Sequence, residues 1–381
     1  SYHSISNPGI LGTVSFYYDH PETIWAAGGN WDFKHHEQEH VCKNLTFDNL
    51  PSHKPFEVEY AVGCALFIHK SLILDIGSND GSLLKGYQKQ GMQVLGIDPA
   101  RDVALDATKN GVETLPIFFN SDIADKLVKK YGKAKIITCN NLIANIDNLN
   151  DFVQGIKKVL DTDGIFISET SYLLSLIDSM VFDTIYHEHL SYFGIKPLEY
   201  LFEQNNLKII NSEIVETKGG SLRFVVTHKK SAFKKSDNLV KLKNIELERK
   251  LYDNNIYKDF EQTINKVKST LVSFIDDALA KGKKVVGYGA SNTTTTLLSH
   301  FELNSKIEYI LDDNKIKIGR FSPHSHIPIY SSEKIYTDNP DFIIIFAWRY
   351  ADIIISRHKK YQDNGGTFIV PLKEFTLIQG K

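Results

Sequence analysis

The feature that most constrains the fold is an alternation of short β-type runs with helix-length segments, which begins at Ser71. Strand-like runs separated by helical patterns are typical of βαβ units, in which helices cover a parallel sheet. The alternation therefore predicts an α/β fold. The strands expected in this first series are 72–76, 93–98, 114–118, 135–139 and 164–169.

The chain continues with a hairpin, a charged stretch and a second βαβ series. Runs at 207–215 and 221–227 flank Thr217-Lys218-Gly219-Gly220, so we expect the first sheet to end in an antiparallel pair. Residues 229–281 carry no strand signal and place apolar residues at helical spacing, which predicts one or two long helices. The strands expected after them are 284–288, 307–311, 341–347 and 367–370.

These changes of pattern predict four parts. Residues 1–68 are rich in aromatic residues and His without a sustained period, and form an atypical N-terminal region. An α/β domain at 69–228, a helical linker at 229–280 and a second α/β domain at 281–381 follow.

Composition excludes several classes of partner. The chain has 44 Lys and Arg against 46 Asp and Glu, a net charge of −2, so we expect no nucleic-acid partner and no anionic membrane surface. The longest apolar run, Phe342–Trp348, is far shorter than the roughly 20 residues of a membrane helix. Because no signal-type segment opens the sequence, we expect a cytoplasmic protein. Three widely spaced cysteines (Cys42, Cys64 and Cys139) indicate neither a disulfide framework nor a metal knuckle.

The sequence LILDIGSNDGS describes a buried strand, a glycine turn and the start of a helix. Gly77 lets the chain leave the strand, and Gly81 opens a helix whose first amides can bind an anion or a carboxylate. Asp98 ends the next strand, where an acid accepts hydrogen bonds from ribose hydroxyls. The three-glycine dinucleotide fingerprint is absent. An acidic turn with Asp75 and Asp80 favours a cationic nucleoside such as S-adenosylmethionine over a pyrophosphate.

The segment FDTIYHEHLSYF, which ends at Phe193, crowds titratable and hydroxyl groups between Tyr186 and Tyr192. His187 and His189 would share a face on a strand and diverge on a helix. The His-Glu-x-x-His zinc pattern is absent, so we expect no metal here.

With this segment the chain resembles the sugar C-methyltransferases that act on nucleotide-linked 4-keto-deoxy sugars. The resemblance also rests on DIGSNDGSLL, on TKGGSLRFVV and on Cys139-Asn140-Asn141. It continues through Gly287-Tyr288-Gly289-Ala290, Gly319-Arg320 and Ala347-Trp348, and covers residues 56–372.

The resemblance implies a class I S-adenosylmethionine-dependent methyltransferase domain and a Rossmann-like C-terminal domain, joined by long helices. It implies that a proton next to a ketone is removed and that the enolate takes the sulfonium methyl, on a dTDP-linked sugar. His189 is then the base, with Tyr186, Glu188 and His187 as further catalytic residues. S-adenosylmethionine is expected to contact Asp75, Gly77, Ser78, Asn79, Gly81, Asp98 and Asn140. The nucleotide-sugar is expected to contact Tyr192, Lys218, Gly219, Tyr288, Asn292, Arg320 and Trp348.

The chain also departs from this family, whose members usually carry an N-terminal zinc module with two CxxC pairs. Here the crowded potential ligands are His35, His36, His40 and Cys42, and a solvated His-rich segment is the favoured interpretation. In addition, Arg349 follows Trp348 where relatives often have Asn. These departures concern the walls of the substrate site, so they bear on which sugar is recognised.

The second glycine loop supports an alternative function. Gly287 and Gly289 follow a strand, Asp312 lies further on, and Asn292 stands where a third glycine would complete a dinucleotide fingerprint. An NAD-dependent oxidoreductase is therefore the rival hypothesis, and a non-catalytic scaffold is a third.

Overall fold

The computed structural model describes residues 72–380 in full. Before them it places the backbone of short strands paired as three two-stranded sheets. The side chains of His35, His36, His40 and Cys42 lie outside the described residues. These early strands are β1 Ile10–Gly12, β2 Ser15–Phe16, β3 Ile24–Ala26, β4 Gly29–Asp32, β5 Glu37–His40 and β6 Leu66–Ile68.

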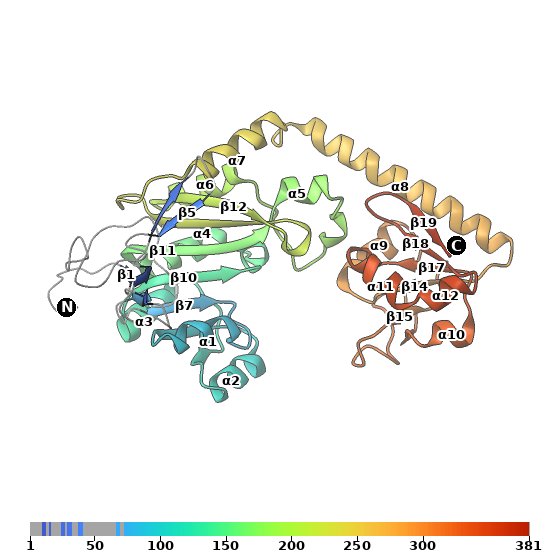
Figure 1. Ribbon diagram of the computed structural model, residues 1–381, viewed down its shortest axis with the longest axis horizontal. Coiled ribbons are helices and arrows are strands. Elements are labelled where there is room, and N and C mark those ends of the chain that lie inside the picture. Colours follow the sequence, from blue (N-terminus) through green and yellow to red (C-terminus); the bar gives the residue numbers. More distant parts are fainter. Residues whose placement is uncertain are drawn as a thin grey trace. The chain divides into compact units, whose positions relative to one another are not determined.

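The first large sheet has seven strands in the order β12-β13-β11-β10-β7-β8-β9 (Figure 1). β7, β8 and β9 pair in parallel, whereas β13 pairs antiparallel with both β11 and β12. The predicted α/β class and the terminal hairpin are thus confirmed. The strands are β7 Leu72–Ile76, β8 Gln93–Ile97, β9 Thr114–Leu115, β10 Ala134–Asn140, β11 Leu160–Ser171, β12 Leu207–Val215 and β13 Ser221–His228.

The helices of this region form where apolar residues recur at helical spacing behind a capping residue. Before α4, for example, the Asn148 side chain accepts the Asp151 N–H, and Phe152, Ile156 and Val159 form a buried face. The helices are α1 Ser82–Lys89, α2 Arg101–Lys109, α3 Ser121–Tyr131, α4 Leu149–Val159, α5 Leu173–Asp178 and α6 Ile195–Gln204, with 3₁₀ turns η3 Ile143–Asn145, η4 Phe182–Thr184 and η5 Thr217–Gly219.

The second large sheet has six strands in the order β16-β15-β14-β17-β18-β19. All neighbours pair in parallel except β19, which runs antiparallel to β18. Sequence patterns did not predict β16, which has three residues, or β19, which is largely exposed and so lacks an apolar pattern. The strands are β14 Val285–Tyr288, β15 Ile310–Asp312, β16 Ile329–Ser331, β17 Phe342–Ile345, β18 Thr367–Val370 and β19 Thr376–Gln379.

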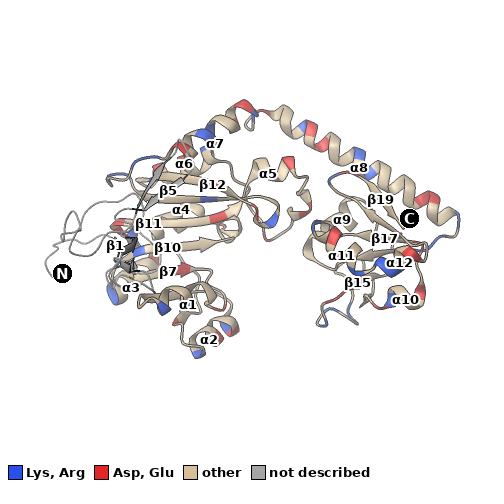
Figure 2. Ribbon diagram, in the orientation of Figure 1, with Lys and Arg blue, Asp and Glu red and all other residues tan. Residues whose placement is uncertain are grey.

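The helices expected in 229–281 are α7 Asp237–Glu248 and α8 Asn254–Ala280. The Asp253 side chain caps α8 by accepting the Asn255 N–H, and a buried stripe includes Ile264, Leu271 and Ile275. Charged residues of both signs recur along the two helices (Figure 2). The remaining helices are α9 Asn292–His300, α10 Lys334–Asp338, η6 Trp348–Tyr350, α11 Ala351–Arg357 and α12 Lys359–Asp363.

Chain contacts divide the protein into two compact units, Ser1–Phe119 with Asp125–Ile137, and Asn120–Ala124 with Thr138–Lys381. The four-part division drawn from the sequence stays a prediction.

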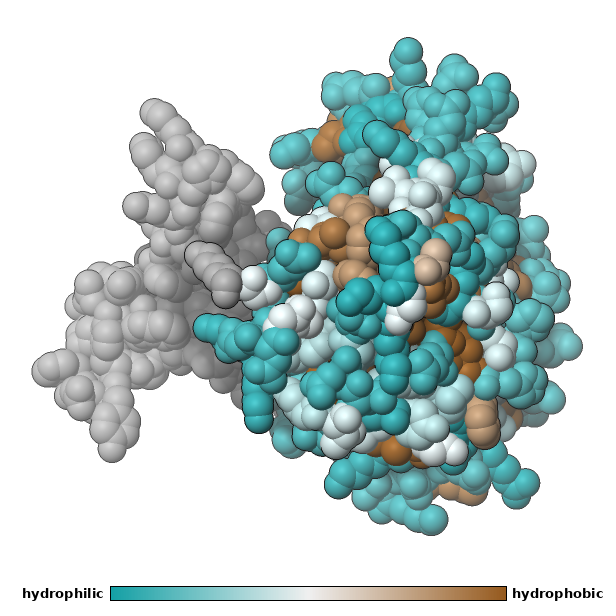
Figure 3. Space-filling model, turned by 90° about the vertical axis from the view of Figure 1, so that its right-hand side faces the viewer, coloured by the Kyte–Doolittle hydropathy of each residue, from teal (hydrophilic) through white to brown (hydrophobic). Residues whose placement is uncertain are grey.

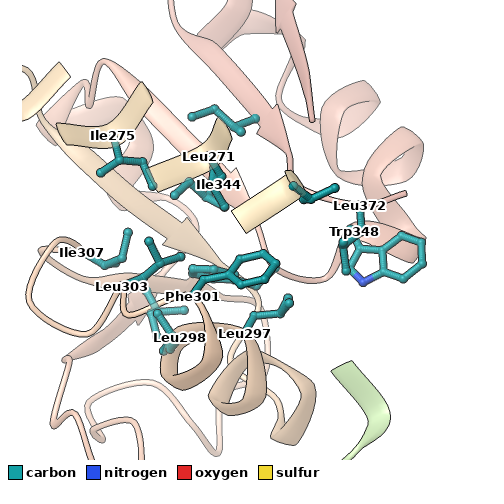
Figure 4. Packing of buried hydrophobic residues seen from close by; sticks show 14 of the residues in the cluster. Leu271, Ile275, Leu297, Leu298, Phe301, Leu303, Ile307, Ile344, Trp348 and Leu372 are labelled. Atoms are coloured by element: carbon teal, nitrogen blue, oxygen red, sulfur yellow. The ribbon is translucent and has the colours of Figure 1, made fainter. Parts of the chain in front are cut away.

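A large hydrophobic cluster of the second unit joins α8, α9 and the second sheet to the segment that leads into η4. Figure 4 shows its centre, with Leu271 and Ile275 from α8, Phe301 after α9, and Trp348 at one side. Phe182 of η4 packs on this cluster, with its ring centroid 5.6 Å from that of Phe301. Burying such a ring stabilises a fold by about 1.5–3 kcal/mol. The histidine segment therefore begins on an anchored turn.

The surface shown in Figure 3 is mostly hydrophilic, and hydrophobic residues show only in small areas between the hydrophilic ones. Of the residues that the structure describes, no helix is long and apolar enough to cross a membrane.

Candidate functional site

The first glycine loop has two positions, Gly77 and Gly81, whose backbone angles favour glycine. Gly77 and Gly81 have φ angles of 77° and 74°, in the left-handed region. Gly81 is the N-cap residue of α1, and a Cβ there would lie 3.0 Å from the Val112 side chain. Both glycines are thus required by backbone shape, and Gly81 also by space.

The acid at the end of β8 is held by backbone amides. Asp98 Oδ2 accepts the Asn79 N–H at 2.9 Å, and Oδ1 accepts the Ala100 N–H at 2.9 Å. A carboxylate oxygen can accept more than one hydrogen bond, so both oxygens keep capacity for ribose hydroxyls. Ser78 is buried, and its Oγ has no hydrogen-bond partner among the described residues.

The remaining polar residues considered at this loop are Asp75, Asp80 and Asn140. Asp75 is buried on β7, and Asn140 is exposed at the end of β10. Asp80 accepts both the N–H and the Oγ–H of Ser82, and these hydrogen bonds lower the pKa of its carboxyl. An ionised turn with an unsatisfied buried hydroxyl fits a ligand that carries positive charge and hydrogen-bonding groups.

The segment that contains His187 and His189 forms a turn. It is therefore neither the strand nor the helix considered from the sequence. His189 Nδ1 lies 2.8 Å from the Thr184 carbonyl oxygen. Because a carbonyl only accepts, Nδ1 carries the proton and donates it, which leaves Nε2 as the basic nitrogen. Leu190 and Ser191 then donate their N–H groups to the Ala144 carbonyl, which fixes the exit of the turn.

Two tyrosines lie against His189. The Tyr186 ring centroid is 4.5 Å from that of His189, and the Tyr192 hydroxyl donates to the same Thr184 carbonyl at 3.0 Å. Burial raises the pKa of Tyr186, and Glu188 adds to the rise, while a hydrogen bond with the Asn292 side chain opposes it. Burial also raises the pKa of Tyr192 to about 12. Both phenols therefore stay protonated near neutral pH.

A pocket of about 290 Å³ brings three predicted residues together: Tyr186, His189 and Lys218. It is lined by Asn141, Ala144, Asn145, Thr170, Ser171, Thr184, Tyr186, His189, Lys218, Thr293, Arg349 and Tyr350. Imidazole, phenol, amide and two cationic groups thus share one small space, which suits proton transfer from a polar substrate.

Some predicted residues are not brought to this pocket. The His187 side chain is 83% exposed, and its Nε2 lies 4.0 Å from Glu188 Oε1. His187 lines a neighbouring pocket of about 420 Å³. Tyr288 is buried in the core of the second sheet, where its hydroxyl donates to Asp313. Arg320 is exposed. Their assigned roles stay predictions.

Other predicted residues line adjoining pockets. Asn292, the first residue of α9, and Trp348 line a pocket of about 420 Å³ with Tyr186. Gly219 and Lys218 line a pocket of about 840 Å³, in which Trp348 also takes part. Gly219 has a φ of 88°, and a Cβ there would lie 3.0 Å from Val181.

Two residues that hold the turn were not singled out from the sequence. Asp183 is fully buried and accepts the Trp348 Nε1–H at 2.9 Å and the Arg349 Nη1–H at 3.3 Å. Burial raises the pKa of its carboxyl, while these two donors lower it. An acid in an otherwise apolar stretch is a signal that could have found Asp183. Thr184 acts through its backbone carbonyl, for which a sequence carries no signal.

The second glycine loop is shaped by packing. A Cβ on Gly287 would lie 2.5 Å from the Phe346 ring, and one on Gly289 would lie 2.6 Å from Ala347 Cβ. Asp312 accepts the Ala290 N–H at 2.8 Å and pairs with Lys317 at 3.2 Å. Close packing therefore explains these glycines without a dinucleotide. Within residues 72–380, no group of three or more His, Cys, Asp or Glu is placed to hold a metal ion.

Comparison with known proteins agrees with this geometry. Residues 216–373 match the family described as C-methyltransferase C-terminal domain, and residues 33–212 match the methyltransferase domain family. The C-methyltransferase NovU of Streptomyces niveus is 31% identical over 311 residues, which cover 81% of this chain and 74% of the relative. The chain belongs to the C-methyltransferase family. It is an S-adenosylmethionine-dependent methyltransferase, as the first loop and the resemblance predicted, and the rival oxidoreductase hypothesis finds no support.

Solved structures with a weaker likeness include two methyltransferases. A Haloferax volcanii methyltransferase complexed with its Trm112 activator is 12% identical, with a TM-score of 0.34, over 42% of this chain and 83% of that one. The magnesium protoporphyrin IX methyltransferase of Synechocystis PCC 6803 is 13% identical, with a TM-score of 0.33, over 42% and 74%. TM-scores this low establish no shared property between these proteins and this chain.

Proposed function

We propose that this C-methyltransferase acts on the carbon next to the ketone of a nucleotide-linked 4-keto-deoxy sugar, with dTDP as the nucleotide. The observation that carries the proposal is His189, whose Nδ1 is bound to the Thr184 carbonyl and whose ring lies beside Tyr186 in a pocket of about 290 Å³. The sequence resemblance to sugar C-methyltransferases supports the substrate class.

Carbon methylation needs a base, because a C–H bond next to a ketone must first lose its proton. With the proton on Nδ1, His189 Nε2 accepts the proton from the substrate carbon, and the electron pair moves into the enolate. S-adenosylmethionine supplies an electrophilic methyl group, and the sulfur keeps the electron pair of the bond that breaks. The products are the methylated ketone and S-adenosylhomocysteine, and the proton taken from the carbon remains on His189 Nε2, so the ring becomes an imidazolium with a proton on each nitrogen.

The charge that develops on the ketone oxygen needs a donor. Tyr186 lies against His189 in the same pocket, and burial raises the pKa of its phenol, so it stays protonated and able to donate. A donor placed where charge develops stabilises the transition state more than the ground state. Tyr186 therefore has the position and the protonation state to stabilise the enolate.

The substrate class is tested by incubating the enzyme with S-adenosylmethionine and a panel of dTDP-, GDP- and CDP-linked 4-keto sugars. Mass spectrometry of the products should show a gain of one methylene unit for a dTDP-linked sugar. If every sugar on the panel returns unchanged while the enzyme binds S-adenosylhomocysteine, the sugar substrate is excluded.

The base is tested by His189→Asn. We expect kcat to fall by about 10²- to 10⁴-fold, because a positioned general base contributes that much. The affinity for S-adenosylmethionine, measured by calorimetry, should not change. His326→Asn, which removes an exposed imidazole elsewhere on the chain, is the matched control. Near-normal methyl transfer by His189→Asn would remove His189 from the role of base.

A further inference from the structure

Arg349 is placed by a buried acid. Its Nη1 donates to Asp183 Oδ1 at 3.3 Å, and its guanidinium carbon lies 5.3 Å from the centre of the Trp348 ring. Trp348 Nε1 donates to the other oxygen of Asp183 at 2.9 Å. Asp183 is fully buried and follows Phe182, which packs on the large hydrophobic cluster. The guanidinium is therefore held from one side by a rigid support.

The opposite side of this guanidinium is available to a ligand. The Arg349 side chain is 27% exposed, and among the described residues an acid pairs with its Nη1 alone. A guanidinium has five N–H donors in a planar fork that matches phosphate and carboxylate oxygens. Holding the group by one nitrogen leaves the remaining donors oriented before a ligand binds.

Arg349 lies where three pockets meet. Pockets of about 840, 420 and 290 Å³ all have Arg349 and Tyr350 among their lining residues. The smallest also contains His189 and Lys218, and no Asp or Glu of the described residues lines it. Lys218 pairs with no acid among the described residues and gives this lining a positive charge, whereas the charge of Arg349 is shared with the buried Asp183. A polar ligand that extends from one of these pockets into another can therefore contact Arg349.

We propose that Arg349 binds the diphosphate of the nucleotide-linked sugar and that Asp183 is the residue that positions it. This inference rests on the proposed function. A diphosphate is bonded directly to the sugar, so a sugar held beside His189 brings its anionic group close to the other residues that line the same pocket. Charge-assisted, bidentate hydrogen bonds from a guanidinium suit this ligand. Lys218, from η5, adds a second positive charge at that place.

The test compares Arg349→Met and Asp183→Asn with the unchanged enzyme. Binding of inorganic pyrophosphate and of dTDP is measured by calorimetry, and the KM of the methyl acceptor and of S-adenosylmethionine by kinetics. For Arg349→Met we expect at least a tenfold weaker pyrophosphate affinity and a similar rise in the acceptor KM. The KM of S-adenosylmethionine should stay constant. Arg349→Lys, which keeps the charge, should restore part of the loss.

Two further variants separate binding from folding. Arg349→Met leaves a buried carboxylate without its cation, so Asp183→Asn/Arg349→Met, which removes both charges, is measured beside it. If Asp183 acts through Arg349, the double variant binds pyrophosphate no more weakly than Arg349→Met, whereas a purely structural effect would add to the loss. Arg249→Met is the matched control, because Arg249 also pairs with an acid, Asp178, and neither residue lines any of these pockets.

The outcomes separate this inference from the proposed function. Methylation of a nucleotide-sugar by Arg349→Met with an unchanged acceptor KM overturns the inference and leaves the proposed function standing. Failure of the unchanged enzyme to bind pyrophosphate also overturns it. If the unchanged enzyme binds pyrophosphate through Arg349 but methylates no sugar on the panel, the anion site stands and the sugar substrate falls.

Discussion

The two glycine loops share a sequence pattern and a backbone geometry but differ in what surrounds them. In each loop an amide N–H donates to an acid at the end of the next strand, from Asn79 to Asp98 and from Ala290 to Asp312. Lys317 neutralises Asp312, whereas no Lys or Arg within residues 72–380 pairs with Asp98. The Asp98 carboxylate of the first loop thus keeps its negative charge available to a ligand. The Asp312 carboxylate of the second loop is already paired with the Lys317 side chain.

The glycines differ in the same sense. Gly77, Gly81 and Gly289 all have positive φ angles, but Gly77 and Gly81 lie on either side of Ser78, a buried hydroxyl without a partner among the described residues. A Cβ on Gly287 or Gly289 would lie 2.5 or 2.6 Å from Phe346 or Ala347, closer than the 3.0 Å between a Cβ on Gly81 and Val112. A strand–glycine–helix pattern thus indicates a close approach to the backbone, while the tertiary neighbours decide whether a ligand or a side chain makes that approach.

The two loops should differ most when the acid of each is neutralised in turn. For Asp98→Asn we expect a 10- to 150-fold weaker affinity for S-adenosylhomocysteine, because hydrogen bonds to a charged group are worth about 1.5–3 kcal/mol. Asp312→Asn should leave that affinity unchanged. Calorimetric titration of both variants measures the difference. Equal affinities in the two variants would show that the loops do not differ as we describe.

Gly287→Ala tests whether packing, and not a ligand, requires glycine in the second loop. The new Cβ would lie 2.5 Å from the Phe346 ring, so we expect a loss of about 1–3 kcal/mol in the free energy of unfolding. Affinity for S-adenosylhomocysteine should not change in the folded protein. Gly86→Ala is the control, since a Cβ at this position in α1 meets nothing within 4 Å and should stabilise the helix. Scanning calorimetry and titration check the two expectations, and unchanged stability of Gly287→Ala would contradict the first.

The smallest effect is expected from Ser78→Ala. Removal of an unpaired buried hydroxyl should slightly stabilise the ligand-free protein and weaken S-adenosylhomocysteine binding by about 0.5–1.5 kcal/mol. Melting curves with and without this ligand separate the two effects. Ser212→Ala removes another unpaired buried hydroxyl, on β12, and should stabilise without weakening binding. An equal loss of binding in both variants would remove Ser78 from the site.

Most of the fold could be predicted, because strands that are buried between helices appear in the sequence as short apolar runs. β7 and β18 match their expected ranges, 72–76 and 367–370, and the hairpin of β12 and β13 follows from its glycine turn. The sequence pattern did not predict β16 or β19, and the physical reason is the same for both. A three-residue strand and an exposed edge strand gain their hydrogen bonds from a neighbouring strand, and need no apolar pattern of their own.

The candidate site was predicted less completely. Side chains crowded in one segment, such as Tyr186 and His189, could be found from the sequence and do line one pocket. The contact of Asp183 with Trp348 joins residues far apart in the chain, and no spacing rule indicates it. His187 stands two residues from His189 but lines another pocket, since a turn has no fixed side-chain period.

The sequence by itself determined the α/β class, the two glycine loops and the residue types that methyl transfer requires. Tertiary structure decided which nitrogen of His189 is basic, which loop acid is already neutralised, and where Arg349 is held. The reason is physical. Periodicity and turn chemistry act between neighbours along the chain, whereas protonation, charge pairing and access depend on atoms that only folding brings together.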